Sequence, residues 1–333
     1  MRLARFLDLA DLTADEVRDL LALAERLQQQ PEPQALAGRI LGLVFLNPSL
    51  RTLASFQAGM ARLGGSSFVI TPGQGTWALE TRLGVRMDGG AAEHIREGLP
   101  VLASYCDALG IRAFAEGRDL DADVADASFR AMAALVDKPL VNLESAINHP
   151  CQALADWKTL DDAAVPARAK FVLSWVPHPR ALPLAVPAAT VHMAAMRGHE
   201  VVVLRPEGFA LPAPVMDKAR AAARAAGGSL CETADRAAAL AGAAVVYAKE
   251  WGSTAHYGDA ARDAALRGAL LDWQLRERSF AGTAPGCRLM HCLPVRRNVA
   301  VADELLDGPR SLVLREAHNR LVVQMAVLYR LLC

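Results

Sequence analysis

The sequence predicts an α/β protein with two similar parallel-sheet domains, helices on both faces of each sheet and an active site in the interdomain cleft. Three observations predict this fold class. Short apolar runs of strand length alternate with helical patterns, and the same alternation starts again near residue 160. The length of 333 residues suits two domains, at about 150 residues for each. In such folds, ligands bind where strand C-terminal ends meet loops and helix N-termini.

The first half begins with an amphipathic helix. Thr13 and Glu16 form the pattern of a capping box, and apolar residues then recur at helical spacing. A strand, a loop and a helix follow, because residues 40–46 are continuously apolar and a helical pattern over residues 50–63 ends at two glycines. The remaining elements expected in this half are strands over residues 67–71, 108–114 and 139–143 and helices over residues 91–105 and 126–135.

The second half repeats the alternation. Its expected strands cover residues 170–175, 200–204, 243–248, 288–291 and 311–314, and its expected helices cover residues 184–197, 213–226 and 317–332. We therefore expect a first domain over residues 1–150, completed by a C-terminal helix over residues 316–333, and a second domain over residues 151–315.

The composition disfavours several classes of partner. The 36 Lys and Arg residues balance the 36 Asp and Glu residues, so no basic excess is available for a nucleic-acid backbone or an anionic membrane. The most apolar long stretch, residues 181–196, contains two prolines and falls short of the ~20 residues that a membrane span needs. The six cysteines contain no C-x-x-C pair, and the N-terminus has no export-signal pattern. We expect a cytoplasmic protein with small-molecule partners.

The loop after the first long strand combines hydroxyl and guanidinium groups. Ser49, Leu50, Arg51 and Thr52 stand where that strand gives way to a helix. A helix N-terminus offers unpaired N–H groups, and an arginine adds charge-assisted hydrogen bonds worth about 1.5–3 kcal/mol each. Alone, the pattern is more typical of an ordinary helix cap beside a surface arginine than of an anion site. Two further motifs follow later strands, His149-Pro-Cys-Gln152 and His291-Cys-Leu-Pro294.

In this order and at these separations, the three motifs resemble those of the carbamoyltransferase family, whose members carry S-T-R-T-R, H-P-x-Q and H-C-L-P. The resemblance covers nearly the whole chain. It implies a site for carbamoyl phosphate that needs no cofactor and no metal, and that holds a phosphate while polarising a carbonyl group. The positions that match the family motifs as phosphate-binding residues are Ser49, Leu50, Arg51, Thr52 and Arg320.

The resemblance also implies how the carbamoyl group is held. Arg112, His149 and Gln152 would bind it, and the main-chain carbonyls of Cys292 and Leu293 would accept hydrogen bonds from its amino group. The residues expected to be catalytic are Arg51, Thr52, Arg112, His149 and Cys292. Leu53 stands in place of the family's second arginine, which we interpret as a supporting ion-pair residue.

The absence of one family motif indicates which amine receives the carbamoyl group. Ordinary ornithine carbamoyltransferases carry D-x-x-x-S-M-G, and at the corresponding place this chain has Lys249. A lysine suits a carboxylate better than an α-ammonium group, which favours an ornithine whose α-nitrogen is acylated. The sequence thus resembles the N-acylornithine branch of the family. That resemblance implies that Glu144, His178, Lys249 and Arg296 hold the acylornithine, and that Trp77 reaches the phosphate site from a neighbouring subunit of a homotrimer.

Two positions bear on the acyl group. Ala92 and Ala300 stand where the acetylornithine enzymes carry a glutamate and a carboxylated lysine. A carboxylate beside the acyl end would repel a succinyl group, so Ala92 favours N-succinyl-L-ornithine as the acceptor and N-succinyl-L-citrulline as the product, in arginine biosynthesis. N-acetyl-L-ornithine is the alternative acceptor, and a non-catalytic anion-binding protein is a third reading. A nicotinamide-dependent oxidoreductase is disfavoured because no G-x-G-x-x-G opens the first helix of the sheet.

Overall fold

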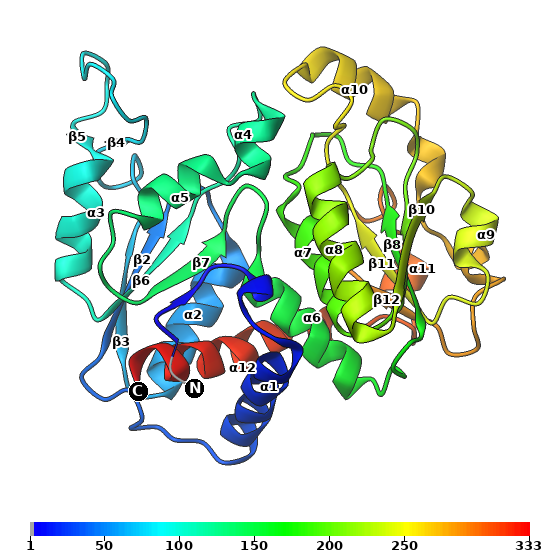
Figure 1. Ribbon diagram of the computed structural model, residues 1–333, viewed down its shortest axis with the longest axis horizontal. Helices are drawn as coiled ribbons and strands as arrows, with labels where there is room; N and C mark the ends of the chain where they lie inside the picture. The colour runs from blue at the N-terminus through cyan, green and yellow to red at the C-terminus, as the bar shows by residue number, and fades with distance from the viewer. Residues whose placement is uncertain (1–2) are drawn as a thin grey trace. The chain divides into compact units, whose positions relative to one another are not determined.

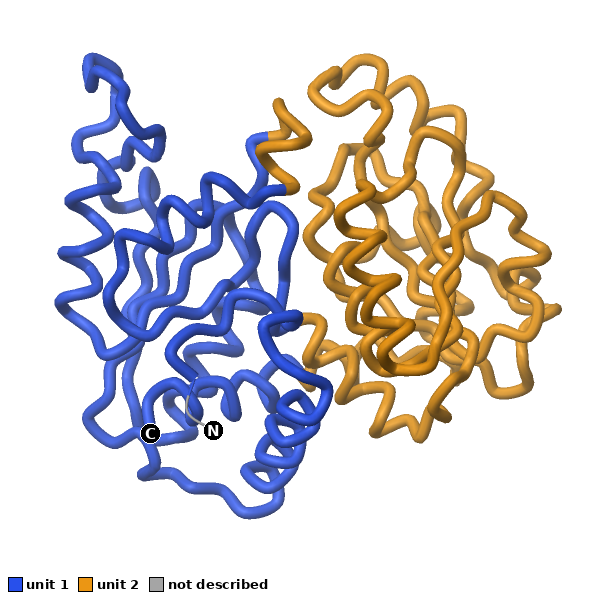
Figure 2. The backbone as a smooth tube through the Cα atoms, viewed as in Figure 1, with its two compact units in different colours: residues 1–116, 125–151, 320–333 blue, residues 117–124, 152–319 orange. Residues whose placement is uncertain are grey.

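The computed structural model describes residues 3–333, and over that range the chain forms two compact units, coloured separately in Figure 2. Unit 1 takes the described part of Met1–Glu116 together with Ala125–Cys151 and Arg320–Cys333, and unit 2 takes Gly117–Val124 and Gln152–Asn319. Each unit contains a five-stranded sheet in which every neighbouring pair is parallel. The predicted fold class, α/β with two parallel sheets, is confirmed.

Unit 1 is built around a sheet whose central strands are the predicted apolar runs. Its strand order is β1 (Arg5–Phe6), β7 (Leu140–Glu144), β6 (Ala108–Arg112), β2 (Ile40–Phe45) and β3 (Ser66–Ile70). Figure 1 shows helices on both sides of this sheet. They are α3 (Ile95–Ser104) and α5 (Ala127–Ala133) on one side, and α2 (Leu50–Arg62) with the C-terminal part of α12 (Val313–Leu332) on the other, beside α1 (Ala14–Gln29).

Unit 2 repeats this architecture. Its strand order is β10 (Ser229–Thr233), β9 (Glu200–Leu204), β8 (Lys170–Trp175), β11 (Val245–Lys249) and β12 (Arg288–Met290). The helices α7 (Ala185–Met196) and α8 (Ala213–Ala226) pack side by side against it (Figure 1). The shorter helices are α4 (Leu120–Val124), α9 (Arg236–Leu240), α10 (Ala260–Gly268) and α11 (Asp303–Leu306). The helix α6 (Pro150–Asp162) begins in unit 1 and continues in unit 2.

Several minor elements complete the fold. The strands β4 (Leu79–Glu80) and β5 (Glu93–His94) form a small parallel ladder. Single 3-10 turns occur at Leu9–Asp11, Leu271–Trp273 and Glu277–Phe280. No helix within residues 3–333 has both the length and the apolar character needed to cross a bilayer.

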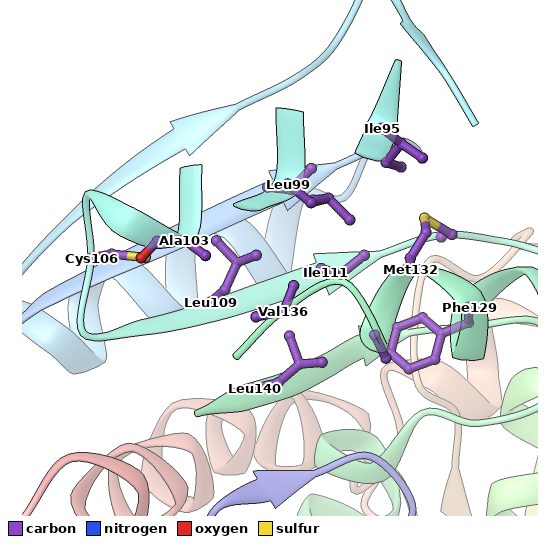
Figure 3. Close-up of a cluster of buried hydrophobic side chains, with 13 residues drawn as sticks. Ile95, Leu99, Ala103, Cys106, Leu109, Ile111, Phe129, Met132, Val136 and Leu140 are labelled. Atoms are coloured by element: carbon purple, nitrogen blue, oxygen red, sulfur yellow. The ribbon is translucent and has the colours of Figure 1, made fainter. Parts of the chain in front are cut away.

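One buried cluster in unit 1 shows how the sequence pattern becomes a core (Figure 3). Ile95, Leu99 and Ala103 recur at helical spacing on α3 and face the sheet, while Leu109 and Ile111 alternate along β6. The β2–β6 contact is close: a Cβ atom on Gly42 would lie 2.7 Å from Leu109 Cδ1 and 2.8 Å from Phe68 Cζ. This part of the core therefore has no room for one more carbon at Gly42.

The structure confirms the capping box at Thr13. Its hydroxyl accepts a hydrogen bond from the Glu16 N–H at 3.2 Å, and the Glu16 carboxylate accepts one from the Thr13 N–H at 2.8 Å. The strand predicted over residues 311–314 is wrong. Ser311 makes only an isolated bridge to Leu289, and α12 begins at Val313, earlier than expected.

The beginning and the end of the described chain lie together in unit 1. The Leu3 N–H donates a hydrogen bond to the Arg330 carbonyl oxygen at 2.9 Å. The strand β1 also adds to the edge of the sheet by pairing with β7. Figure 1 shows the two ends side by side.

Candidate active site

The strand ends of unit 1 gather several of the predicted site residues. The strands β7, β6 and β2 are neighbours, and because they are parallel their carboxyl ends share one edge of the sheet. Glu144 is the last residue of β7, Arg112 is the last residue of β6, and these two residues are partners in the strand register. The loop after β2 leads to Ser49 at the start of α2.

The first turn of α2 is capped and sits against an arginine from α12. Ser49 Oγ accepts a hydrogen bond from the Thr52 N–H at 3.3 Å, as an N-cap residue does. Thr52 is 1% exposed, and its hydroxyl oxygen accepts a hydrogen bond from Arg320 Nη2 at 3.1 Å. Arg51 is half-buried, whereas the Leu50 side chain points outward and is 81% exposed. Leu50 can therefore contribute only its main chain to an anion that binds at the N-terminus of α2.

Arg112, Glu144 and His149 form a buried group beside this turn. The Glu144 carboxylate accepts a hydrogen bond from Arg112, and its Oε2 atom lies 3.4 Å from His149 Nε2. The Arg112 guanidinium group lies 4.5 Å from the centroid of the Phe114 ring. Glu144, expected to bind the acylornithine, thus already balances a cation within unit 1.

The charges around His149 indicate which class of ligand this part of unit 1 can bind. Burial lowers the pKa of His149 well below 6.5, and the charges of Arg320, Arg112 and Arg51 lower it further. The imidazole is therefore neutral near pH 7. We call Arg51, Arg112 and Arg320 the arginine cluster. All three charges act on His149, and positive charge concentrated beside a helix N-terminus suits a doubly charged anion such as a phosphate group.

Trp77 and Ala92 lie in the segment that carries β4 and β5. The Trp77 indole N–H donates a hydrogen bond to Glu93 Oε2 at 2.7 Å. Because Glu93 directly follows Ala92 in the chain, this bond holds Trp77 close to Ala92. Trp77 is 62% exposed and Ala92 is also exposed. Trp77 and Ala92 are therefore exposed at the surface, in contrast to Arg112 and Arg320 of the arginine cluster, which are buried.

In unit 2, three residues with titratable side chains meet at the ends of β11 and β12. Lys249 ends β11, and its Nζ lies 3.0 Å from Glu250 Oε2. The same oxygen lies 3.2 Å from His291 Nε2, directly after β12. Burial tends to raise the pKa of Glu250, but the Lys249 cation and the hydrogen bonds from Lys249 and His291 outweigh it and lower this pKa far below 4.5. Sequence reasoning missed Glu250, because an acid beside a lysine at a strand end is as typical of a surface pair as of a buried one.

The turn after β12 is held by His291. The Leu293 N–H donates a hydrogen bond to His291 Nδ1 at 2.9 Å, and Leu293 has a left-handed φ of 56°. Burial raises the pKa of the Cys292 thiol to about 12, despite the nearby Lys249 cation. Cys292 is therefore a neutral thiol near pH 7 and does not act as a thiolate.

Gln152 is anchored by two buried acids that the sequence analysis did not identify. Its Nε2 donates hydrogen bonds to Asp156 Oδ1 at 2.7 Å and to Glu316 Oε1 at 3.1 Å. Glu316 also accepts hydrogen bonds from the His291 N–H and the Tyr247 hydroxyl. Burial, together with the nearby Asp156 charge, raises the pKa of Glu316 well above 4.5. The available signal was spacing: Asp156 lies one helical turn after Gln152.

His178 and Arg296 meet elsewhere in unit 2. Arg296 Nε lies 3.4 Å from His178 Nε2, and Arg267 Nη1 donates a hydrogen bond to the His178 carbonyl oxygen at 2.8 Å. Burial lowers the pKa of His178 from 6.5, so its ring is neutral near pH 7. With Lys249 and Arg296, unit 2 supplies two of the predicted cations for a substrate with carboxylates. In the described part of the chain, no cluster of three His, Cys, Asp or Glu residues is arranged to bind a metal ion.

Comparison with known proteins gives a consistent result. Residues 5–162 match a family model described as aspartate/ornithine carbamoyltransferase, carbamoyl-P binding domain, and residues 186–331 match its Asp/Orn binding domain. The chain is 37% identical over 332 residues to N-acetylornithine carbamoyltransferase of Xanthomonas campestris pv. campestris, covering 98% of this chain and 97% of that protein. It is 35% identical over 323 residues to N-succinylornithine carbamoyltransferase of Bacteroides thetaiotaomicron, covering 95% of each.

Solved structures agree with these matches. Acetylornithine transcarbamylase complexed with acetylcitrulline superposes with a TM-score of 0.94 at 35% identity, covering 99% of both chains. A mutant of N-acetyl-L-ornithine transcarbamylase complexed with carbamyl phosphate and N-succinyl-L-norvaline superposes with a TM-score of 0.93 at 36% identity, covering 98% of this chain and 99% of that one.

Proposed function

Because this chain belongs to the aspartate/ornithine carbamoyltransferase family, we propose that it transfers the carbamoyl group of carbamoyl phosphate to the δ-amine of an N-acylornithine. The products are an N-acylcitrulline and phosphate, and the reaction is a step of arginine biosynthesis. The observation that carries this proposal is the arginine cluster with its neutral His149, placed at the strand ends beside the N-terminus of α2.

The phosphate group binds at the first turn of α2. Ser49, Leu50, Arg51 and Thr52 surround it, with Leu50 contributing through its main chain, and Arg320 adds a buried cation. The charge-assisted bonds from the arginines contribute about 1.5–3 kcal/mol each.

The carbamoyl group is polarised by donors and oriented by acceptors. Arg112, Thr52 and His149 act on its carbonyl oxygen, where each donor aimed at the developing oxyanion contributes about 2.7–4 kcal/mol. The acceptors for its amino group are Gln152 and the main-chain carbonyls of Cys292 and Leu293. Asp156 and Glu316 hold the Gln152 side chain in place through its Nε2 atom.

The acylornithine is held by Glu144, His178, Lys249 and Arg296. Lys249 and Arg296 supply cations for its carboxylates, and His178 supports Arg296. A carboxylate oxygen has several acceptor sites, so Glu144 retains capacity for a substrate N–H group beyond its bond with Arg112.

The δ-amine attacks the carbonyl carbon in its neutral form, and the tetrahedral intermediate expels phosphate. A free alkylamine has a pKa of about 10.4, so a proton must leave the amine. Cys292 is a poor acceptor because its thiol, with a pKa of about 12, is not ionised. His178 is a weak base because its pKa is lowered by burial. We propose that the departing phosphate accepts the proton that leaves the amine.

We propose N-succinyl-L-ornithine as the acceptor. The argument is Ala92, a small neutral residue exposed beside Glu93 and Trp77, which leaves room for the succinyl carboxylate. N-acetyl-L-ornithine is the second candidate, because the relative from Xanthomonas campestris is named for it.

The test is a side-by-side assay of product formation with ornithine, N-acetylornithine and N-succinylornithine. We expect the highest kcat/KM with N-succinylornithine. Ala92→Glu should lower kcat/KM for N-succinylornithine about tenfold more than for N-acetylornithine, which corresponds to about 1.4 kcal/mol of added repulsion. Ala92→Gln is the matched control, because it has nearly the same size without the charge. An unchanged ratio in Ala92→Glu contradicts the assignment of the acyl group.

A further inference from the structure

Glu250 makes two hydrogen bonds through one atom. Its Oε2 lies 3.0 Å from Lys249 Nζ and 3.2 Å from His291 Nε2, and its side chain is 1% exposed. Its Oε1 has no hydrogen-bond partner within residues 3–333. A buried carboxylate that keeps both donors on one oxygen fixes the positions of both.

The contacts of His291 define its tautomer. The Leu293 N–H donates to Nδ1 at 2.9 Å, so Nδ1 carries no proton. In the neutral ring the proton is therefore on Nε2, which donates it to Glu250. A ring with its proton on Nδ1 would lose the bond to Leu293. Glu250 thus selects the tautomer that the turn requires.

The turn depends on this bond. Leu293 has a φ of 56°, a region that residues with a side chain adopt reluctantly. The ring of His291 is fully buried, and the His291 N–H is itself held by Glu316 at 2.9 Å. When the ring keeps its place, the hydrogen bond to Leu293 opposes relaxation of the turn.

We propose that Glu250 is a positioning residue, which fixes the His291 tautomer and through it the turn whose Cys292 and Leu293 carbonyls receive the carbamoyl amino group. The part of this inference that concerns the substrate rests on the proposed function. The part that concerns the turn rests on the hydrogen bonds alone. Glu250 also holds Lys249, which is proposed to bind the acylornithine. The same carboxylate therefore positions a group for each of the two substrates.

The first measurement is made on the wild-type protein with 15N-labelled histidine. Long-range 15N–1H correlation identifies which nitrogen of His291 carries the proton. We expect the Nε2–H tautomer, with His291→Gln used to assign the signal. A proton on Nδ1 overturns the proposal, whether or not the protein is active.

The second measurement compares Glu250→Leu with Glu250→Gln. Removing the acceptor in Glu250→Leu should shift His291 toward the Nδ1–H tautomer and raise the KM for carbamoyl phosphate about tenfold, the effect of one hydrogen bond. Glu250→Gln keeps an acceptor oxygen of the same reach, and should restore the wild-type tautomer and most of the KM. Glu232→Leu, which removes a carboxylate paired with Arg205 in the same unit, is the matched control.

The outcomes separate the two proposals. An Nε2–H tautomer that changes in Glu250→Leu and returns in Glu250→Gln supports the positioning role, even if no ornithine derivative is carbamoylated. An active enzyme whose KM and tautomer are the same in all three proteins contradicts the positioning role and leaves the proposed function standing. If Glu250→Leu does not fold, the wild-type tautomer and the Glu250→Gln variant decide the question.

Discussion

At the scale of single residues, Arg51 offers the most direct test of the anion site. It stands in the first turn of α2, and its charge contributes to the lowered pKa of His149. Arg51→Gln should lower kcat/KM for carbamoyl phosphate about 100-fold or more, since it removes charge-assisted bonds worth about 3 kcal/mol. Arg62→Gln, an exposed residue in the last turn of the same helix, is the control. Equal activity in the two variants would remove Arg51 from the site.

His149 also predicts a dependence of stability on pH. Its pKa in the folded protein is lowered well below 6.5, first by burial and then by the arginine cluster. Below pH 6.5 the unfolded chain therefore binds a proton that the folded protein does not bind, so the free energy of unfolding falls as the pH falls. Each such proton contributes a slope of up to about 1.4 kcal/mol per pH unit.

The measurement is chemical denaturation at several pH values between about 5 and 7. His199, whose pKa burial lowers to about 4, contributes a slope of the same sign. His149→Gln should therefore remove the contribution of one proton from the slope of the unfolding free energy against pH, and the contribution of His199 should remain. A slope that is identical in His149→Gln and the wild type would show that His149 is accessible to protons in the folded state.

The sequence predicted residues with strong local signals and missed those defined by tertiary contacts. Ser49 and Arg51 follow a strand and open a helix, so the local pattern placed them at a helix N-terminus, and the two later motifs were needed to predict an anion site there. Glu250 and Glu316 matter because strands and helices distant in the chain bring donors to them. No local pattern distinguishes such a buried acid from a surface acid.

At the scale of elements, close packing between β2 and β6 gives a test of the fold in unit 1. Gly42→Ala places a carbon within 2.7 Å of Leu109 Cδ1 and 2.8 Å of Phe68 Cζ. Because the neighbours are core side chains, we expect a loss of about 1–3 kcal/mol in the free energy of unfolding, measured by denaturant titration. Gly89→Ala, where nothing lies within 4 Å, is the matched control and should be neutral. A neutral Gly42→Ala would mean that this interface is looser than described.

The element boundaries were predicted well where burial and period agree. The strands over residues 170–175 and 200–204 and the helix over residues 213–226 match the structure at both ends. The strand β10 was missed because its sequence, Ser-Leu-Cys-Glu-Thr, is half polar and lies at the sheet edge. The wrong strand at residues 311–314 had an apolar composition, but the chain turns into α12 after one bridge. Composition alone did not distinguish these two cases.

At the scale of the whole molecule, we propose that the protein works as a homotrimer in which Trp77 completes the phosphate site of a neighbouring subunit. The exposure of the Trp77 ring, 62%, leaves it available for a contact outside its own subunit. Trp77→Ala should weaken carbamoyl phosphate binding, measured as an increase in KM.

A subunit-mixing experiment tests this arrangement. At a carbamoyl phosphate concentration well below their raised KM, the Trp77→Ala and Arg51→Ala proteins should each have little activity, and the two are unfolded and refolded together in equal amounts. Random assembly pairs an intact Arg51 with an intact Trp77 of a neighbour at about a quarter of the sites, so about a quarter of wild-type activity should return. A mixture as inactive as its components would indicate that each subunit contains its complete site.

The hydrogen bond between Leu3 and Arg330 has a consequence for the order of folding. Unit 1 draws on both ends of the described chain, whereas the main segment of unit 2 is continuous from Gln152 to Asn319. On the ribosome, which makes the chain from its N-terminus, unit 2 therefore has all its strands before Arg320 of unit 1 is synthesised. The anion site therefore lacks Arg320 until the strands of unit 2 have been made, although the first turn of α2 is synthesised long before them.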